Sequence, residues 1–183
     1  MDFRRRESMK KPAPSNLLIR RYEPEWASHL PILSRIMLIS RGPVMELGMG
    51  IYSTPLLHHF CMEQHRQLYS YENVKPWFDA HQYWQARYHQ IEFVEDWDMV
   101  PIEKYHWGLV FVDHDAPRRS IDAIRAARYA DFVVIHDSNG RYDFEYKVST
   151  VAPFFKYRYT YNFLMNHTDV FSNFIPVHTL WSI

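Results

Sequence analysis

The chain has 183 residues, with 21 basic and 21 acidic side chains, and 47% of its residues are hydrophobic. This length suits one domain with a substantial core, and the apolar content excludes a largely disordered chain. A formal net charge of zero gives no general attraction for nucleic acid or for an anionic membrane. Cys61 is the only cysteine, so no internal disulfide can form and a cytoplasmic location is expected.

The first residues differ in composition from the rest of the chain. Residues 1–15 are rich in Arg, Lys and Pro and lack the apolar centre of a signal peptide. We expect them to form a flexible basic tail, with residues 16–183 forming a single domain. No apolar run approaches the roughly 20 residues that cross a bilayer, so no membrane partner is expected.

Strand and helix patterns alternate along the chain, which indicates a parallel sheet with helices on both faces. Helices are expected at 25–40, 55–64, 76–87 and 117–130, with a helix or an irregular stretch at 143–155. Strands are expected at 44–47, 67–71, 91–94, 108–112 and 132–135. Residues 156–161 and 170–174 flank a turn and predict an antiparallel hairpin. The link 95–107 is too short for the usual helix between strands three and four.

Residues 46–55 read Glu-Leu-Gly-Met-Gly-Ile-Tyr-Ser-Thr-Pro, between the first strand and a helix. Gly48 and Gly50 permit positive φ and close approach of the backbone to a ligand. Ser53 or Thr54 can cap the helix, which would leave backbone N–H groups facing a ligand. A dinucleotide fingerprint would carry its third glycine at the position of Ser53.

The pattern Glu-x-Gly-x-Gly-x-x-Ser resembles motif I of the class I S-adenosylmethionine (SAM) methyltransferases. The resemblance implies a doubly wound α/β fold, Rossmann-like, with a mostly parallel seven-stranded sheet that ends in a C-terminal antiparallel hairpin. It also implies SAM as the cofactor. Glu46, Gly48 and Gly50 would lie against the methionine part of SAM, with Ser53 beside them, because a carboxylate suits a cationic amino group.

Acidic residues follow the next two strands, at the edge where open α/β sheets bind ligands. Glu72 comes 22 positions after Gly50, close to the spacing of roughly 20 for a carboxylate that accepts hydrogen bonds from ribose hydroxyls. The resemblance implies that an acid after strand three, for which we choose Asp96, contacts the adenine amino group. Trp97 would then cover the adenine ring.

Two further polar clusters follow strands four and five: Asp113-His114-Asp115 and His136-Asp137-Ser138-Asn139. Neighbouring strands lie about 4.8 Å apart, so Asp113 and Asp137 can converge. This pair resembles the catechol O-methyltransferase-like branch, where an acid and an Asp-Asn pair hold Mg²⁺. A Mg²⁺ site of Asp113, Asp137 and Asn139 is therefore implied, although Ser138 separates the last two residues here.

Other interpretations of these clusters remain open. His114 or His136 could act as a general base, together with Asp113, since an unperturbed imidazole titrates near pH 6.5. The same residues could instead stabilise loops at the sheet edge. Arg118 and Arg119, at the start of the next helix, would either bind an anionic group of a substrate or face solvent.

These patterns predict a SAM-dependent methyltransferase that acts on a small-molecule acceptor, with a hydroxyl oxygen as the first choice. A macromolecular acceptor would need additional contact surface, from the N-terminal tail or from a homodimer. Two alternatives from other classes remain: a non-catalytic SAM-binding scaffold, and an NAD-dependent oxidoreductase. Ser53 in place of the third glycine argues against the oxidoreductase.

Overall fold

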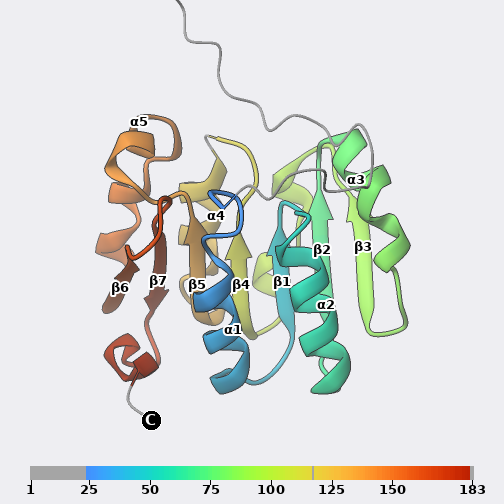
Figure 1. The fold of residues 1–183 in the computed structure, drawn as a ribbon, viewed down its shortest axis with the longest axis horizontal. Coiled ribbons are helices and arrows are strands. Elements are labelled where there is room, and N and C mark those ends of the chain that lie inside the picture. The colour runs from blue at the N-terminus through green and yellow to red at the C-terminus, as the bar shows by residue number, and fades with distance from the viewer. Residues whose placement is uncertain (1–23, 117, 182–183) are drawn as a thin grey trace, which may run out of the picture.

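The computed structural model of the protein describes residues 24–116 and 118–181, so the predicted tail 1–15 lies outside the described residues. Seven strands form one sheet in the order β3-β2-β1-β4-β5-β7-β6 (Figure 1). The strands are β1 (Val44–Leu47), β2 (Leu68–Glu72), β3 (His89–Phe93), β4 (Trp107–Val112), β5 (Ala130–His136), β6 (Tyr157–Tyr161) and β7 (Thr168–Ser172). β1 to β5 pair in parallel, and β7 is antiparallel to both β5 and β6. The predicted sheet and its C-terminal hairpin are confirmed.

Helices cover both faces of this sheet. They are α1 (Leu30–Ile39), α2 (Ser53–Glu63), α3 (Lys75–His81), α4 (Arg118–Ala126) and α5 (Asp143–Tyr146). In Figure 1, α1 and α2 lie in front of the sheet and α4 lies behind it. Between β3 and β4 the described chain forms only two short 3-10 turns, at 97–99 and 102–104, as the short link predicted. No helix of the described residues is long and apolar enough to cross a membrane.

Several helix ends differ from those expected, for local reasons. α1 begins at Leu30 instead of residue 25, because Pro31 has no N–H to donate and is best accommodated in the first turn. α3 ends at His81, and a 3-10 turn at 82–84 follows it. The chain must reverse there, because β3 begins at His89, two residues earlier than predicted.

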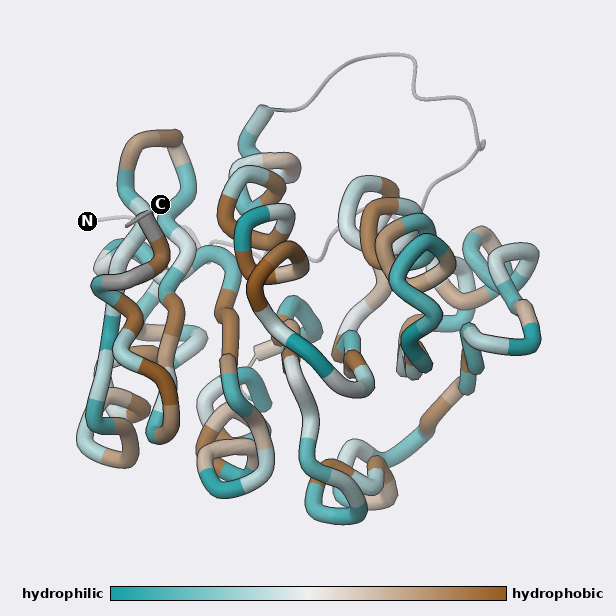
Figure 2. The backbone as a smooth tube through the Cα atoms, turned by 90° about the horizontal axis from the view of Figure 1, so that it is seen from below, coloured by the Kyte–Doolittle hydropathy of each residue, from teal (hydrophilic) through white to brown (hydrophobic). Residues whose placement is uncertain are grey.

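The core consists of two apolar layers, one on each face of the sheet. The layer under α1 and α2 includes Ile32, Leu33, Ile36, Leu57, Cys61, Leu109 and Phe111. The layer under α4 includes Trp97, Ile102, Trp107, Val110, Ala123 and Ala126. Every residue of β4 is buried, as expected for a strand that is covered on both faces. In Figure 2 the helices alternate between hydrophobic and hydrophilic segments, which fits helices with one buried side.

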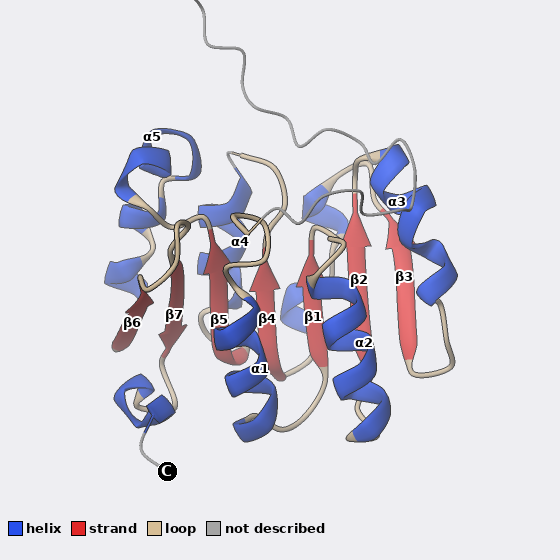
Figure 3. Cartoon of the chain, in the orientation of Figure 1, coloured by secondary structure: helices blue, strands red, loops and turns tan. Residues whose placement is uncertain are grey.

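The carboxyl ends of β1 to β5 meet at one edge of the sheet, marked by the arrowheads in Figure 3. The antiparallel strand β7 begins at the same edge, because Thr168 pairs with His136. The turn 162–167 between β6 and β7 therefore lies beside the loop that follows β5. This edge, called the carboxyl edge below, holds the polar clusters identified in the sequence.

Candidate active site

The glycine loop, residues 48–52, joins β1 to α2 at the carboxyl edge. Gly48 has φ +89°, and a Cβ added to it would lie 2.5 Å from the backbone nitrogen of His114. Glycine is therefore required for the loop to pass the backbone that follows β4. Gly50 lies outside the positive-φ region, contrary to our expectation, and an added Cβ there would meet only Ser53 Oγ, at 3.1 Å.

The N–H groups of this loop are bound within the protein. Gly48 donates to Tyr71 O at 2.9 Å, and Gly50 donates to Thr54 Oγ1 at 3.0 Å. α2 begins at Ser53 after Tyr52, with no side-chain cap, so the predicted capping by Ser53 or Thr54 is wrong. The Thr54 hydroxyl instead fixes the conformation of the loop from within the first turn of the helix.

Glu46 lies beneath the loop and is fully buried. Its carboxylate accepts hydrogen bonds from Thr54 Oγ1, at 3.0 and 3.1 Å, and from Ser70 Oγ, at 2.6 Å. Burial raises the pKa of Glu46 to about 7, since the low-dielectric interior disfavours the charged form. In the described structure Glu46 therefore contacts the hydroxyl groups that hold the loop.

Glu72 connects the end of β2 to the glycine loop. One carboxylate oxygen accepts a hydrogen bond from the N–H of Met49 at 3.0 Å. The other accepts from the N–H groups of Asn73 and Val74, at 2.9 and 2.8 Å. The side chain is only 4% exposed, so these bonds hold Glu72 at the carboxyl edge next to the loop.

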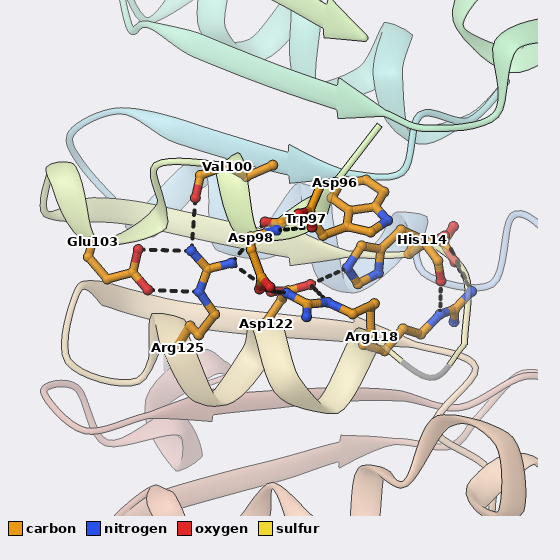
Figure 4. Close-up of polar contacts among 11 residues, drawn as sticks. Asp96, Trp97, Asp98, Val100, Glu103, His114, Arg118, Asp122 and Arg125 are labelled. Carbon is orange, nitrogen blue, oxygen red and sulfur yellow. Dashed lines mark hydrogen bonds and ion pairs between the residues drawn. The ribbon is translucent and has the colours of Figure 1, made fainter. Parts of the chain in front are cut away.

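The two residues predicted to hold adenine differ in their surroundings. Asp96 is exposed and accepts a hydrogen bond from the N–H of Asp98 at 2.9 Å. Trp97 is buried, and its ring packs edge-to-face against the ring of His114, with a centroid distance of 4.2 Å (Figure 4). His114 Nε2 in turn lies 2.8 Å from Asp122 Oδ2, with both side chains completely buried. His114 is thus directed toward α4.

Arginine side chains of α4 fasten the helix-free link between β3 and β4. Arg125 donates to the carbonyl oxygens of Trp97 and Val100, at 3.0 and 2.9 Å, and binds Glu103 (Figure 4). Arg118 forms ion pairs with Asp98 at 2.7 Å and with Asp122 at 3.0 Å. These contacts fix the link between β3 and β4 against α4, in the place where a helix would otherwise pack.

Arg119 joins the loops after β4 and β5. Its side chain is 2% exposed, and its guanidinium lies 2.9 Å from Asp113 Oδ1 and 3.3 Å from Asp137 Oδ2. It also donates to the carbonyl oxygen of His136 at 2.8 Å. The interpretations of Arg119 as a solvent-facing or substrate-binding residue are therefore wrong. Asp113 and Asp137 converge as predicted, and a guanidinium of the protein itself lies between them.

The residues suggested for Mg²⁺ do not fit a shared ion. Mg²⁺ requires several oxygen ligands in near-octahedral geometry, yet of these three residues only the carboxylates of Asp113 and Asp137 remain to offer oxygen atoms. The Asn139 amide oxygen accepts from the N–H of His167 at 2.7 Å, and its amide nitrogen donates to the Met165 carbonyl at 3.0 Å. Asn139 therefore holds the turn 162–167.

His136, at the end of β5, lies within a group of polar side chains. Its Nδ1 is 3.3 Å from Asp113 Oδ1, and its Nε2 is 2.9 Å from Ser28 Oγ. The His29 ring lies 4.5 Å from the His136 ring, measured between centroids. Sequence reasoning missed Ser28 and His29, because they lie inside an expected helix and show no spacing relation to the residues after β4 and β5.

No family model and no curated protein sequence matches this chain. Several solved structures, however, are similar to this chain in fold. The O-methyltransferase from Bacillus cereus in complex with S-adenosylhomocysteine (SAH) has 12% sequence identity and a TM-score of 0.58, with 84% of this chain and 83% of that chain covered. The human methyltransferase 10 domain containing protein has 10% identity and a TM-score of 0.57, covering 83% of each chain. A methyltransferase from Pyrococcus furiosus has 12% identity and a TM-score of 0.53, covering 85% of this chain and 88% of that one.

The likeness to these structures agrees with the strand order and with the C-terminal antiparallel hairpin. The chain therefore has the fold of the class I SAM-dependent methyltransferases.

Proposed function

We propose that this protein transfers the methyl group of SAM to a hydroxyl oxygen of a small-molecule acceptor. One observation carries the proposal: Gly48 of the glycine loop packs directly on the backbone of Asp113 and His114. The loop expected to hold the cofactor thus touches the segment that carries the Asp113–His136 pair. A donor and an acceptor bound at these two places would meet at the carboxyl edge.

The proposed cofactor site lies over β1 and β2. SAM supplies, when bound, a methyl group on a sulfonium centre that a nucleophile can displace. Glu72 is an acceptor-only group at the edge of the loop, so ribose hydroxyls can donate to it alongside the loop N–H groups. Glu46 acts as a positioning residue, because its carboxylate holds the Thr54 hydroxyl that fixes Gly50. Asp96 and Trp97 form the adenine side.

The proposed acceptor site lies over β4 and β5. His136 and Asp113 are within 3.3 Å of each other, and Ser28 holds the opposite nitrogen of the imidazole. Because the Ser28 hydroxyl donates to the Glu25 carbonyl, it accepts from Nε2–H, and the nitrogen that faces Asp113 would take up the proton of an acceptor hydroxyl. Phe163, Leu164 and Met165 are exposed in the turn that Asn139 holds next to the end of β5, which suits an acceptor with an apolar part. Asp113 and His136, rather than His114, are thus the proposed catalytic residues.

Calorimetry with SAM, SAH and NAD tests the cofactor. We expect SAM and SAH to bind and NAD to give no heat. Glu72→Gln should weaken SAH binding by about tenfold or more, since a hydrogen bond to a charged group contributes roughly 1.5–3 kcal/mol. Glu92→Gln, at an exposed position of β3, is the matched control. Binding of NAD alone, or no binding of SAH, would refute the cofactor proposal.

SAH release from SAM in the presence of a panel of small hydroxylated acceptors tests the reaction. Asp113→Asn and His136→Ala should abolish turnover while they leave SAH affinity within a fewfold of the unmodified protein. That split separates an enzyme from a SAM-binding scaffold. A scaffold would bind SAH equally well and release none from SAM with any acceptor.

A further inference from the structure

Three buried side chains from three separate elements converge at the acceptor side of the carboxyl edge. His29 precedes α1, Asp113 follows β4 and His136 ends β5. One ligand atom from each lies within 4.8 Å of the other two. All three residues are at most 5% exposed. The folding of the sheet thus assembles two imidazoles and one carboxylate around one point.

We propose that His29, Asp113 and His136 bind a divalent transition-metal ion of the Zn²⁺ type. Open zinc sites use three protein ligands of this kind, such as two His and one carboxylate, and keep a fourth position for water or substrate. Imidazole nitrogen favours such ions over Mg²⁺, which prefers oxygen. The role of this ion in methyl transfer rests on the proposed function. The binding of the ion does not rest on it and can be tested separately.

The separation of two of these ligands fits an ion between them. His136 Nδ1 and Asp113 Oδ1 lie 3.3 Å apart, which is long for a direct N–H···O hydrogen bond. Two ligands at about 2.0 Å from one tetrahedral ion lie roughly 3.3 Å from each other. The ligand atoms of the three residues lie within 4.8 Å of one another, so those that are farthest apart would have to move closer together to share one ion at about 2.0 Å.

Outer contacts already orient two of the ligands. His136 Nε2 lies 2.9 Å from Ser28 Oγ and 3.4 Å from Asp137 Oδ1, so it can donate its proton there and leave Nδ1 for the ion. Arg119 lies 2.9 Å from Asp113 Oδ1, the oxygen that also faces His136 Nδ1, so this carboxylate would contact the guanidinium and the ion together. Metal-bound histidines commonly donate their second nitrogen to a carboxylate or a similar acceptor, which fixes the tautomer and the ring orientation.

The charges of the site favour an acceptor that ionises. Asp113, Asp137 and Arg119 together carry one negative charge. A bound dication makes the total one positive charge, and an oxygen that has lost its proton to water restores neutrality. A hydroxyl in the fourth position would therefore have a lowered pKa. With an ion bound, Asp113 and His136 would act as its ligands, and the proton of the weakly acidic hydroxyl would pass to water instead of to the imidazole.

Equilibrium dialysis of the metal-free, full-length protein with Zn²⁺, and absorption spectroscopy with Co²⁺, test the site without any methyl transfer. We expect one equivalent to bind, visible d–d bands of Co²⁺ in a low-symmetry site, and no competition from Mg²⁺. His29→Ala should lower Zn²⁺ affinity by more than about 100-fold, and Ser28→Ala by about tenfold, as for a lost outer contact. Asn139→Ala and His89→Gln are controls that should keep full affinity.

The inference is overturned if the unmodified protein binds no stoichiometric Zn²⁺, or if His29→Ala binds it unchanged. Thermal unfolding shows whether each variant folds. If His29→Ala does not fold, His29→Gln, which is closer in volume to the original residue, is used in its place. SAH calorimetry on the same metal-free sample keeps the two proposals apart. SAH binding without Zn²⁺ binding removes only the metal site, whereas Zn²⁺ binding without SAH binding removes the proposed methyl transfer.

Discussion

Ser70 donates a 2.6 Å hydrogen bond from β2 to the buried carboxylate of Glu46 in β1. The same hydroxyl lies 2.9 Å from His89 Nε2. His89 Nδ1 lies 3.0 Å from His58 Nδ1, and His58 Nε2 is 2.6 Å from the Tyr88 hydroxyl. A continuous row of polar contacts therefore runs from beneath the glycine loop across the sheet to α2. Burial raises the pKa of Glu46 at one end of this row and lowers the pKa values of His89 and His58.

Glu46 should make the stability of the protein depend on pH. Burial raises its pKa in the folded state from 4.5 to about 7, so between these values the folded state binds more protons than the unfolded state. The free energy of unfolding must then fall as pH rises through this window, by on the order of 3 kcal/mol in total. Glu46→Gln removes this contribution, so its stability relative to the unmodified protein should increase from pH 5 to pH 8.

Urea denaturation at each pH measures this difference. His89 acts in the opposite direction, because burial lowers its pKa from 6.5 to about 3 and its contribution to stability is lost as pH falls below 6.5. That contribution is present in both proteins and cancels in the comparison. A difference between the proteins that stays constant with pH would show that Glu46 ionises normally.

Gly48→Ala should destabilise the protein strongly. Its φ of +89° suits glycine, and the new Cβ would lie 2.5 Å from the backbone of His114. We expect a loss of more than about 2 kcal/mol, since the left-handed region alone costs roughly 1–2 kcal/mol for other residues. Gly50→Ala is the matched control and should cost less, because its new Cβ meets only the Ser53 side chain. Equal losses in guanidinium denaturation would contradict this account of the loop.

Arg119→Met should cost about 3–5 kcal/mol of stability, because it leaves the buried carboxylates of Asp113 and Asp137 without their cation. Arg118→Met, the neighbouring position of α4, should cost about 1 kcal/mol or less. The Arg118 side chain is partly exposed and its partner Asp98 is largely exposed, while its buried partner Asp122 would keep its contacts with Arg125 and His114. Chemical denaturation of both variants measures the contrast. Similar losses in the two would mean that Arg119 contributes no more than an ordinary surface ion pair.

Asn139→Ala should loosen the turn 162–167 while leaving the sheet intact. The change removes the hydrogen bonds to the Met165 carbonyl and the His167 N–H, so exchange of the His167 amide proton should become faster. Asn173→Ala also loses two side-chain hydrogen bonds to carbonyls, of Ala127 and Phe154, and serves as the control. Hydrogen exchange measured by NMR should show faster exchange at His167 only in Asn139→Ala.

The fold followed closely from local patterns. Apolar runs such as 108–112 and the β-rich segments after residue 156 identified the sheet, its parallel part and its C-terminal hairpin. Element ends were less predictable, since they depend on tertiary geometry: the start of α1 is determined by Pro31, and α3 ends early because the chain must turn back to begin β3 at His89. Those constraints act between segments that the sequence alone does not place together.

The candidate site was predictable only in part, for a related reason. The acids after the strands were found because a single rule places all parallel carboxyl ends at one edge. Arg119 was missed as a partner of Asp113 and Asp137, although two buried acids at neighbouring strand ends require a cation. His29 and Ser28 reach the site from the turn that precedes α1, and nothing in their spacing reveals that approach.

The antiparallel pairing of β7 with β5 places two separately anchored segments at the carboxyl edge, so that each can change in sequence without the other. The tip that carries Phe163, Leu164 and Met165 is anchored to the end of β5 through Asn139, whereas the glycine loop is anchored to β2 through Glu72. The two anchors share no side chain. The sequence of the tip could therefore change, and with it the proposed acceptor specificity, without disturbing the glycine loop that we propose binds the methyl donor.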